Sequence, residues 1–123
     1  AILSKIGTGV WTLQYNQNDN SGKIYCDDIS RQLFAIGTDL SPAQCFDYVM
    51  NRMDEKDLSY ALELLRTAND AEHVEQLEFT WDHPTAGNMQ MRITGKFSKG
   101  NADGSLVFEG FVHARSSQDT LDD

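Results

Sequence analysis

The sequence lacks the features of a membrane-spanning or secreted chain. None of its apolar runs approaches the roughly 20 residues that a helix needs to cross a bilayer, and no signal peptide is present. Only two cysteines occur, Cys26 and Cys45. Their spacing is not that of a metal site, and nothing in the sequence indicates the oxidising compartment that a disulfide requires. We therefore expect a domain that folds without a metal or a disulfide and makes no contact with a membrane.

Basic residues are also few. The chain has 10 Lys and Arg against 19 Asp and Glu, which gives a formal net charge of −9 at pH 7. So acidic a surface repels the phosphate backbone of nucleic acids, and no basic patch interleaved with aromatic residues opposes that repulsion. We expect no nucleic-acid partner. The 123 residues, 40% of them apolar, suit one globular domain.

The sequence does contain hydrophobic patterning whose period changes twice along the chain. Residues 9–15 alternate apolar and polar side chains, which is typical of a half-buried strand, and a turn rich in Asn, Asp, Ser and Gly follows them. Apolar residues take helical spacing in the middle of the chain, and alternation returns after it. The predicted elements are strands at residues 9–15 and 23–27, helices at 28–37, 41–53 and 54–70, and strands at 75–82, 88–97 and 105–114.

The helix boundaries carry capping residues. Gly37 stands where a helix can end in a left-handed residue, and Ser41 with Pro42 and Gln44 has the pattern of a capping box. Asp54 can cap the longest helix. The buried stripe predicted for that helix comprises Leu58, Ala61, Leu62, Leu65 and Ala68.

The order of these elements predicts the fold class. Consecutive strands joined by short turns favour an antiparallel sheet, and the helical segment between them then has to cover one face of that sheet. We therefore predict an α+β domain in which a five-stranded antiparallel sheet has three helices packed on one face.

The ordered set of segments resembles the PAS domain family, in particular the subgroup common in bacterial sensor proteins. The resemblance runs from about Ile6 to Ser116. It implies a PAS-like sheet wrapped by helices, with an internal pocket. The segments that carry it are "GVWTLQY", "IYCDDISRQLFAIG", "MNRMDEKDLSYALELL", "EFTWDHPTAGNMQMRITGKF" and "ADGSLVFEGFVHARS".

The resemblance implies a sensory domain of a cytoplasmic, multidomain bacterial signalling protein of the histidine kinase or diguanylate cyclase type. Residues 1–116 would be the single domain, and residues 117–123 a polar linker to a downstream effector domain outside this sequence. The domain would sense a small ligand, form a homodimer, or do both. Two alternatives stay open: a ligand-free protein-interaction domain, and a small cone-shaped acid–base enzyme.

Two positions depart from the family pattern. Met53 and Asp54 stand where many members have His-Pro before the long helix. Ala114, Arg115 and Ser116 stand where many members end the last strand on an Asp-Ile-Thr-like motif. The chain therefore lacks the aspartate that commonly couples the sheet to the effector domain.

Asp82 and His83 form the only candidate catalytic couple. Adjacent strand residues face opposite sides of a sheet, so these two side chains are not expected to meet. Pro84 follows them and suits a turn between strands. We interpret Asp82 and His83 as the solvated end of a hairpin and predict that the chain has no catalytic residue and is not an enzyme.

The sequence does not carry the residue patterns that metal, haem or flavin sites require. The histidines His73, His83 and His113 fall in separate elements, so no metal-ligand set is expected. Haem-binding relatives use a histidine on the long helix, whose body has none here. Flavin-binding relatives use a cysteine in an Asn-Cys-Arg-Phe-Leu context, which neither Cys26 nor Cys45 has. We expect no haem, no flavin and no metal.

The apolar interior remains as a candidate binding site. Four methionines make it deformable enough to admit a small apolar or aromatic ligand, and every inward strand position other than Tyr15 is predicted to be apolar or glycine. The alternative is a completely filled core. The predicted pocket residues are Trp11, Phe34, Phe46, Met50, Met53, Leu62, Phe79, Trp81, Met91 and Phe108.

The last strand also places Val107 and Phe111 on the side opposite the core. Two exposed apolar side chains on one strand suggest an interface, with a second copy of the chain or with an upstream helix. Alternatively, Ile2, Leu3 and Ile6 of this same chain cover them.

Overall fold

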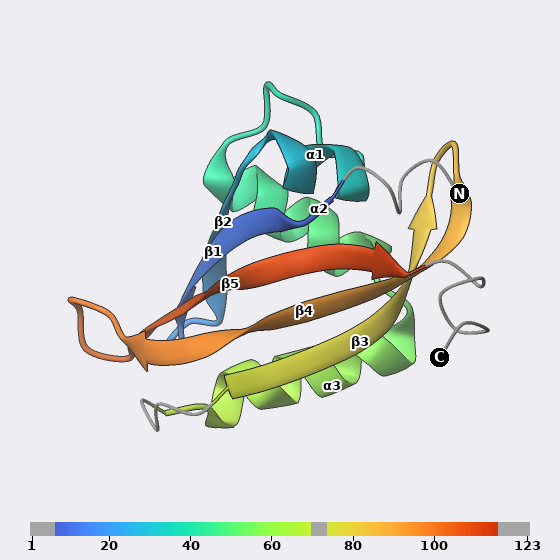
Figure 1. Cartoon of the computed structure of the whole chain (residues 1–123). Helices are drawn as coiled ribbons and strands as arrows, with labels where there is room; N and C mark the ends of the chain where they lie inside the picture. The colour runs from blue at the N-terminus through green and yellow to red at the C-terminus, as the bar shows by residue number, and fades with distance from the viewer. Residues whose placement is uncertain (1–6, 70–73, 116–123) are drawn as a thin grey trace.

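The computed structural model describes residues 7–69 and 74–115 of the chain. Within these ranges, five strands and three helices follow the predicted order (Figure 1). None of the helices in these ranges is long and apolar enough to cross a membrane. The elements are β1 (Gly9–Asn16), β2 (Ser21–Cys26), α1 (Asp28–Phe34), α2 (Pro42–Arg52), α3 (Glu55–Thr67), β3 (Val74–His83), β4 (Gly87–Lys99) and β5 (Ser105–Arg115).

The five strands form one antiparallel sheet in the order β2-β1-β5-β4-β3. The last three strands pair as neighbours, and β5 then pairs with β1, so the first and last strands meet inside the sheet. In this register Leu13 lies opposite Phe108 on the buried face, and Val10 lies opposite Phe111 on the exposed face. The predicted fold class is confirmed.

The helices lie on one face of the sheet. In Figure 1, α1 and α2 lie against β1 and β2, and α3 runs along β3 at the other end of the sheet. The predicted capping box starts α2, because Ser41 Oγ accepts a hydrogen bond from Gln44 N at 3.2 Å and Gln44 Oε1 accepts one from Ser41 N at 2.8 Å. These bonds satisfy backbone groups that a helix start leaves unpaired.

Helix α1 ends earlier than predicted. Ala35, and not Gly37, adopts the left-handed conformation that closes the helix, with φ of 57°. The Ile36 N–H then donates to Arg31 O at 2.8 Å, and the Ile36 side chain is buried. Burial of Ile36 therefore outweighs the preference of left-handed backbone for glycine.

The buried face of α3 differs from the predicted stripe at one residue. Ala61 and Leu65 are buried and Leu64 is half-buried, whereas Leu62 is 37% exposed. Each residue advances about 100° around a helix. Leu62 is therefore turned away from the side of Ala61 on which Leu64 lies, and the prediction that it points inward is wrong.

Two polar side chains attach α3 to the sheet. Gln17, in the turn between β1 and β2, donates through Nε2 to backbone carbonyls at the end of α3, including those of Leu65 and Ala68 at 3.0 Å. Near the start of the helix, Asp57 Oδ2 accepts a hydrogen bond from Thr80 N on the edge strand β3 at 3.1 Å. Both bonds satisfy backbone groups that regular secondary structure leaves open.

An aromatic cluster joins α1 to the sheet. The Phe34 ring stacks on Trp11 with centroids 5.4 Å apart, and it meets Trp81 edge-on at 5.0 Å. Phe79 completes the cluster at 6.2 Å from Phe34. Such pairs contribute about 0.5–1.5 kcal/mol each beyond burial of their area. Phe34 and Trp81 are thus anchored as packing residues.

Candidate ligand cavity

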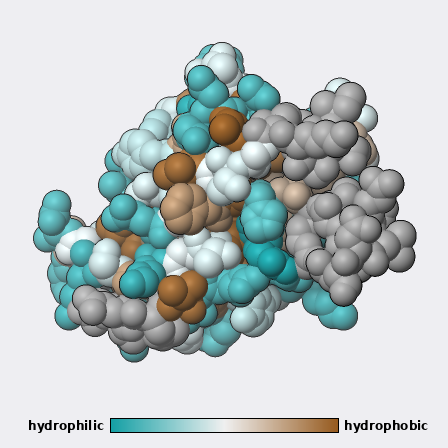
Figure 2. All heavy atoms as spheres, in the orientation of Figure 1, coloured by the Kyte–Doolittle hydropathy of each residue, from teal (hydrophilic) through white to brown (hydrophobic). Residues whose placement is uncertain are grey.

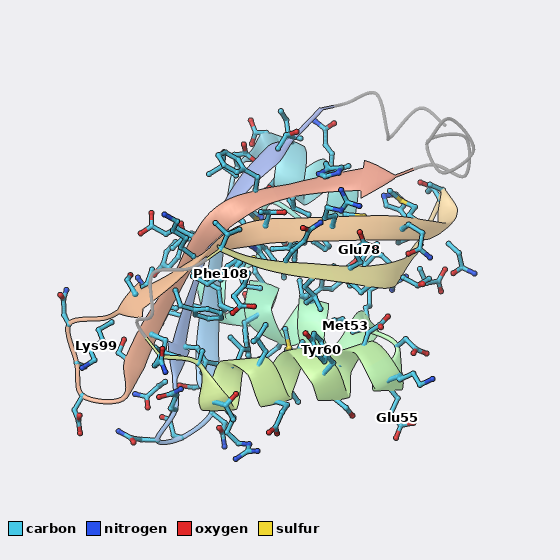
Figure 3. The ribbon with its side chains drawn as sticks, turned by 60° about the horizontal axis from the view of Figure 1, so that its bottom comes forward. Met53, Glu55, Tyr60, Glu78, Lys99 and Phe108 are labelled. Carbon is cyan, nitrogen blue, oxygen red and sulfur yellow. The ribbon has the colours of Figure 1, made fainter. Side chains whose placement is uncertain are left out.

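An apolar cavity of about 60 Å³ lies between the inner face of the sheet and helices α2 and α3. Figure 3 shows two of its residues, Phe108 on a strand and Met53 at the end of α2. Five of the predicted pocket residues line it: Trp11, Met50, Met53, Phe79 and Phe108. The other lining residues are Leu13, Val49, Ala61, Leu64, Leu65, Glu75, Leu77, Ile93 and Phe97.

The remaining predicted pocket residues lie elsewhere. Phe34, Phe46, Trp81 and Met91 are buried but do not line the cavity. Leu62 faces solvent on α3. The inward alternation of the strands identified the buried side correctly, but it carried no information on which buried residues are packed together and which border an open space.

Ile93 and Phe97 on β4 line the cavity, although the pocket prediction omitted them. Both share the inward parity of Met91 along the strand, so the signal that would have found them was present in the sequence. Phe97 lies opposite Phe108 in the β4–β5 register, and the two ring centroids are 4.9 Å apart. This pair forms one wall of the cavity.

Two glycines, Gly95 and Gly110, interrupt the side chains in one row across the sheet. One row across the inner face runs from Trp11 through Gly110 and Gly95 to Glu75. A Cβ atom on Gly95 would lie 2.8 Å from the Phe108 ring, which is closer than atoms pack. The row therefore has no side chain between Trp11 and Glu75.

Two of the lining residues, Trp11 and Glu75, also carry polar groups. Trp11 Nε1 is buried and has no hydrogen-bond partner among the residues that the structure describes. A buried unpaired donor costs about 1–3 kcal/mol, which an acceptor on a bound molecule would recover. Glu75 is half-buried and lies two residues before Leu77 on β3, so the two side chains point to the same face of the sheet. The prediction that Tyr15 is the only polar side chain pointing inward from a strand is therefore wrong.

His83 also contradicts the sequence interpretation, because it is buried (7% exposed) rather than solvated. The alternation of inward and outward side chains along β3 continues through His83, which therefore points inward. Its ring contacts backbone groups on two segments. His83 Nε2 lies 3.2 Å from Gln32 O, and Nδ1 accepts hydrogen bonds from Ala86 N at 3.1 Å and Thr85 N at 3.2 Å. We assign the proton to Nε2 on these partners. Asp82 is exposed, so the two side chains form no acid–base unit.

No group of three or more His, Cys, Asp and Glu within residues 7–69 and 74–115 is placed to hold a metal ion. His113 is half-buried on β5, and His73 lies outside the described residues. Cys26 is half-buried and Cys45 is buried, and neither lines the cavity.

The outer face of the sheet carries an exposed apolar pair. Val10 and Phe111 lie opposite each other on β1 and β5 and are 50% and 56% exposed, while Val107 is half-buried. A shallow hollow beside Phe111 also includes Val74 and Lys96. Figure 2 shows hydrophobic atoms between hydrophilic ones on the face turned to the viewer. We call Val10 and Phe111 the outer apolar pair.

Several sequence-based expectations concern residues outside the described ranges. They include the cover of the outer face by Ile2, Leu3 and Ile6, the domain boundary at Ser116, and the linker at 117–123.

Comparison with known proteins yields structural matches alone. No protein-family profile matches the chain, and no curated protein sequence matches it. Among solved structures, the N-terminal domain of a diguanylate cyclase with PAS/PAC sensor from Marinobacter aquaeolei superposes with a TM-score of 0.60 at 13% identity, over 89% of this chain and 97% of that chain.

Two sensor kinase structures match to the same degree. A sensory box histidine kinase/response regulator from Burkholderia thailandensis E264 has a TM-score of 0.61 at 12% identity, over 98% of this chain and 86% of that chain. A domain of a proposed light and redox sensing histidine kinase from Haloarcula marismortui has a TM-score of 0.61 at 10% identity, over 89% of this chain and 90% of that chain. The chain therefore has the PAS fold that its sequence segments predicted.

Proposed function

We propose that this chain is a non-catalytic sensory domain of a cytoplasmic bacterial signalling protein, of the histidine kinase or diguanylate cyclase type. The observation that carries the proposal is the apolar cavity between the sheet and the helices, which is lined in part by Trp11, a residue whose buried indole N–H has no partner among the described residues. The shared fold with sensor domains of a diguanylate cyclase and of histidine kinases supports it.

The cavity favours a small apolar or aromatic ligand with one hydrogen-bond acceptor for Trp11 Nε1. At about 60 Å³, it is smaller than the cavity of about 150 Å³ that holds benzene in an engineered protein. A ligand therefore has to displace side chains as it enters. Met50 and Met53 line the cavity and are flexible enough to move without breaking the fold.

Signal transmission would follow from this displacement. A ligand shifts a conformational equilibrium only by the difference in its affinity for the two states. Here the two states differ in how α2 and α3 pack on the sheet. Strand β5 borders the cavity through Phe108 and carries Phe111 on its other face, so it connects the cavity to the outer apolar pair and to whatever follows the domain.

The outer apolar pair would serve a homodimer. Full burial of Val10 and Phe111 would contribute on the order of 3–5 kcal/mol before entropic costs. Two copies pairing through this face would place the two β5 strands close together. An effector domain in the same chain would then respond to a change in their relative position.

A cavity-filling variant tests the sensing role. Ala61 is buried in the cavity lining, so Ala61→Leu should fill the space and abolish binding of acetophenone, a small aromatic ketone, in titration calorimetry. Ala43→Leu is the matched control, because Ala43 lies exposed on α2. Acetophenone that binds the wild type and both variants equally would contradict a ligand site in this cavity.

The small volume of the cavity favours one second candidate, a ligand-free protein-interaction domain. In that case native mass spectrometry of gently purified protein would detect no retained small molecule, and acetophenone would not bind. The acid–base enzyme has less support, because Glu75 is the one ionisable residue among the lining residues described.

A further inference from the structure

Strand β3 forms one edge of the sheet, and two hydrogen bonds show which way its backbone groups point. Thr80 N donates to Asp57 Oδ2 at 3.1 Å, and Asp82 O accepts a hydrogen bond from Arg52 Nη2 at 2.7 Å. Both backbone groups therefore point away from β4. Backbone groups alternate in direction along an antiparallel strand, and β3 pairs with β4 in one continuous register. Every second residue of β3, counted from Thr80, thus presents its N–H and C=O to the free edge.

The two halves of this edge differ. Helices α2 and α3 cover the C-terminal half through these two hydrogen bonds. In the N-terminal half the groups that face the edge belong to Val74, Gln76 and Glu78. Gln76 is exposed, and its backbone N–H and C=O have no hydrogen-bond partner on the edge side among the residues that the structure describes. We call residues 74–78 the open edge.

The side chains of the open edge determine which strand could pair with it. The segment contains no proline, glycine or lysine, and its pairing with β4 has no bulge, so several features that commonly prevent edge pairing are missing. Glu75 points to the inner face of the sheet. A charge in that position disfavours an apolar strand and favours one with a basic residue opposite it. Leu77, also on the inner face, is half-buried and suits an apolar neighbour.

We propose that the open edge binds an extended basic peptide as a sixth strand, antiparallel to β3. Backbone hydrogen bonds to the edge-facing groups hold the peptide, with a basic residue opposite Glu75 and an apolar residue opposite Leu77. Strand β3 has three acidic residues and no lysine or arginine, and the chain carries a net charge of −9. These charges attract a basic peptide. They disfavour pairing of this edge with the same edge of a second copy, which would bring acidic strands together.

Titration of the full chain with a synthetic peptide tests the site. The probe is acetyl-Ser-Lys-Val-Thr-Lys-Val-Ser-amide, whose central threonine lies opposite Gln76 in the proposed register. Amide spectra should show saturable shifts at Gln76 and slower hydrogen exchange of its N–H. N-methylation of the threonine should weaken binding about tenfold, because it removes the N–H that donates to Gln76 O. N-methylation of the second lysine is the matched control and should leave binding unchanged, since that N–H points away from β3.

Two variants at one position test the protein side of the contact. Gln76→Pro removes the N–H that faces the edge, at a place in a sheet where proline is tolerated, and should weaken binding about tenfold. Gln76→Ala keeps that N–H and should bind the peptide as the wild type does.

Three results would overturn the proposal. The first is the absence of saturable shifts with the unmodified peptide. The second is equal binding of the two N-methylated peptides, which would show charge attraction without strand pairing and needs only the wild-type protein. The third is self-association of the wild type that Gln76→Pro abolishes, because a second copy would then occupy the edge. None of these results bears on whether the cavity binds acetophenone.

Discussion

His83 joins the turn between β3 and β4 to the end of α1 through one buried ring. Its Nδ1 accepts backbone N–H groups of the turn, and its Nε2 contacts Gln32 O. The alternation along β3 places His83 on the inward side of the strand, but Pro84, one residue later, favoured the prediction of a solvated turn. Burial here depends on α1, which is distant in the sequence, so local pattern alone could not predict it.

Replacing His83 should destabilise the domain. We expect His83→Ala to lower the free energy of unfolding by about 1–3 kcal/mol, because backbone groups of the turn lose their partner in a buried setting. Asp82→Ala is the matched control and should change stability by less than about 0.5 kcal/mol, since Asp82 is exposed. Urea unfolding measures both. Equal losses in the two variants would show that the ring bonds contribute nothing specific.

Helix α3 illustrates what patterning can and cannot predict for a whole element. Its existence, its acidic first turn and its Asp54 cap were readable from the sequence. The predicted inward face of α3 included Leu62, whereas the observed one includes Leu64. Either leucine fits helical spacing beside Ala61, so the sequence did not distinguish them. The choice between them depends on how the helix is rotated against the sheet, and Gln17 and Asp57 help to set that rotation through long-range bonds.

Two leucines of α3 provide a matched test of this orientation. Leu65→Ala should cost about 2–4 kcal/mol of unfolding free energy, because Leu65 is 4% exposed and lines the cavity. Leu62→Ala should cost less than about 1 kcal/mol, because Leu62 faces solvent. Denaturant unfolding compares the pair. Similar losses of several kcal/mol in both variants would mean that α3 packs on the sheet through the predicted face, which includes Leu62 as well as Leu65.

For the whole molecule, the order of elements was sufficient to predict the class and the topology of neighbouring strands. The pairing of β1 with β5 was not predicted, because it joins opposite ends of the domain and no local signal marks it. Cavities are least predictable, because the alternation that buries Met91 and Ile93 alike does not distinguish filled from open space.

The outer apolar pair predicts association of two copies. Phe111→Asp should shift a dimer toward monomer in size-exclusion chromatography with light scattering, because it places a charge on the proposed apolar contact. Tyr60→Asp is the control, since Tyr60 is an aromatic residue exposed on α3. Each copy carries a net charge of −9, so added salt should strengthen association of the wild type. Unchanged association of Phe111→Asp would exclude this face as the interface.

The central claim is that the cavity between helices and sheet admits a small ligand that pairs with Trp11. The most direct measurement is the nitrogen–proton spectrum of the two tryptophan indoles during titration with acetophenone, with ethylbenzene as the probe that lacks an acceptor. We predict that acetophenone shifts the Trp11 indole proton downfield, that ethylbenzene shifts it much less, and that Trp81, outside the cavity, changes little. An unmoved Trp11 resonance at saturating acetophenone would contradict the account.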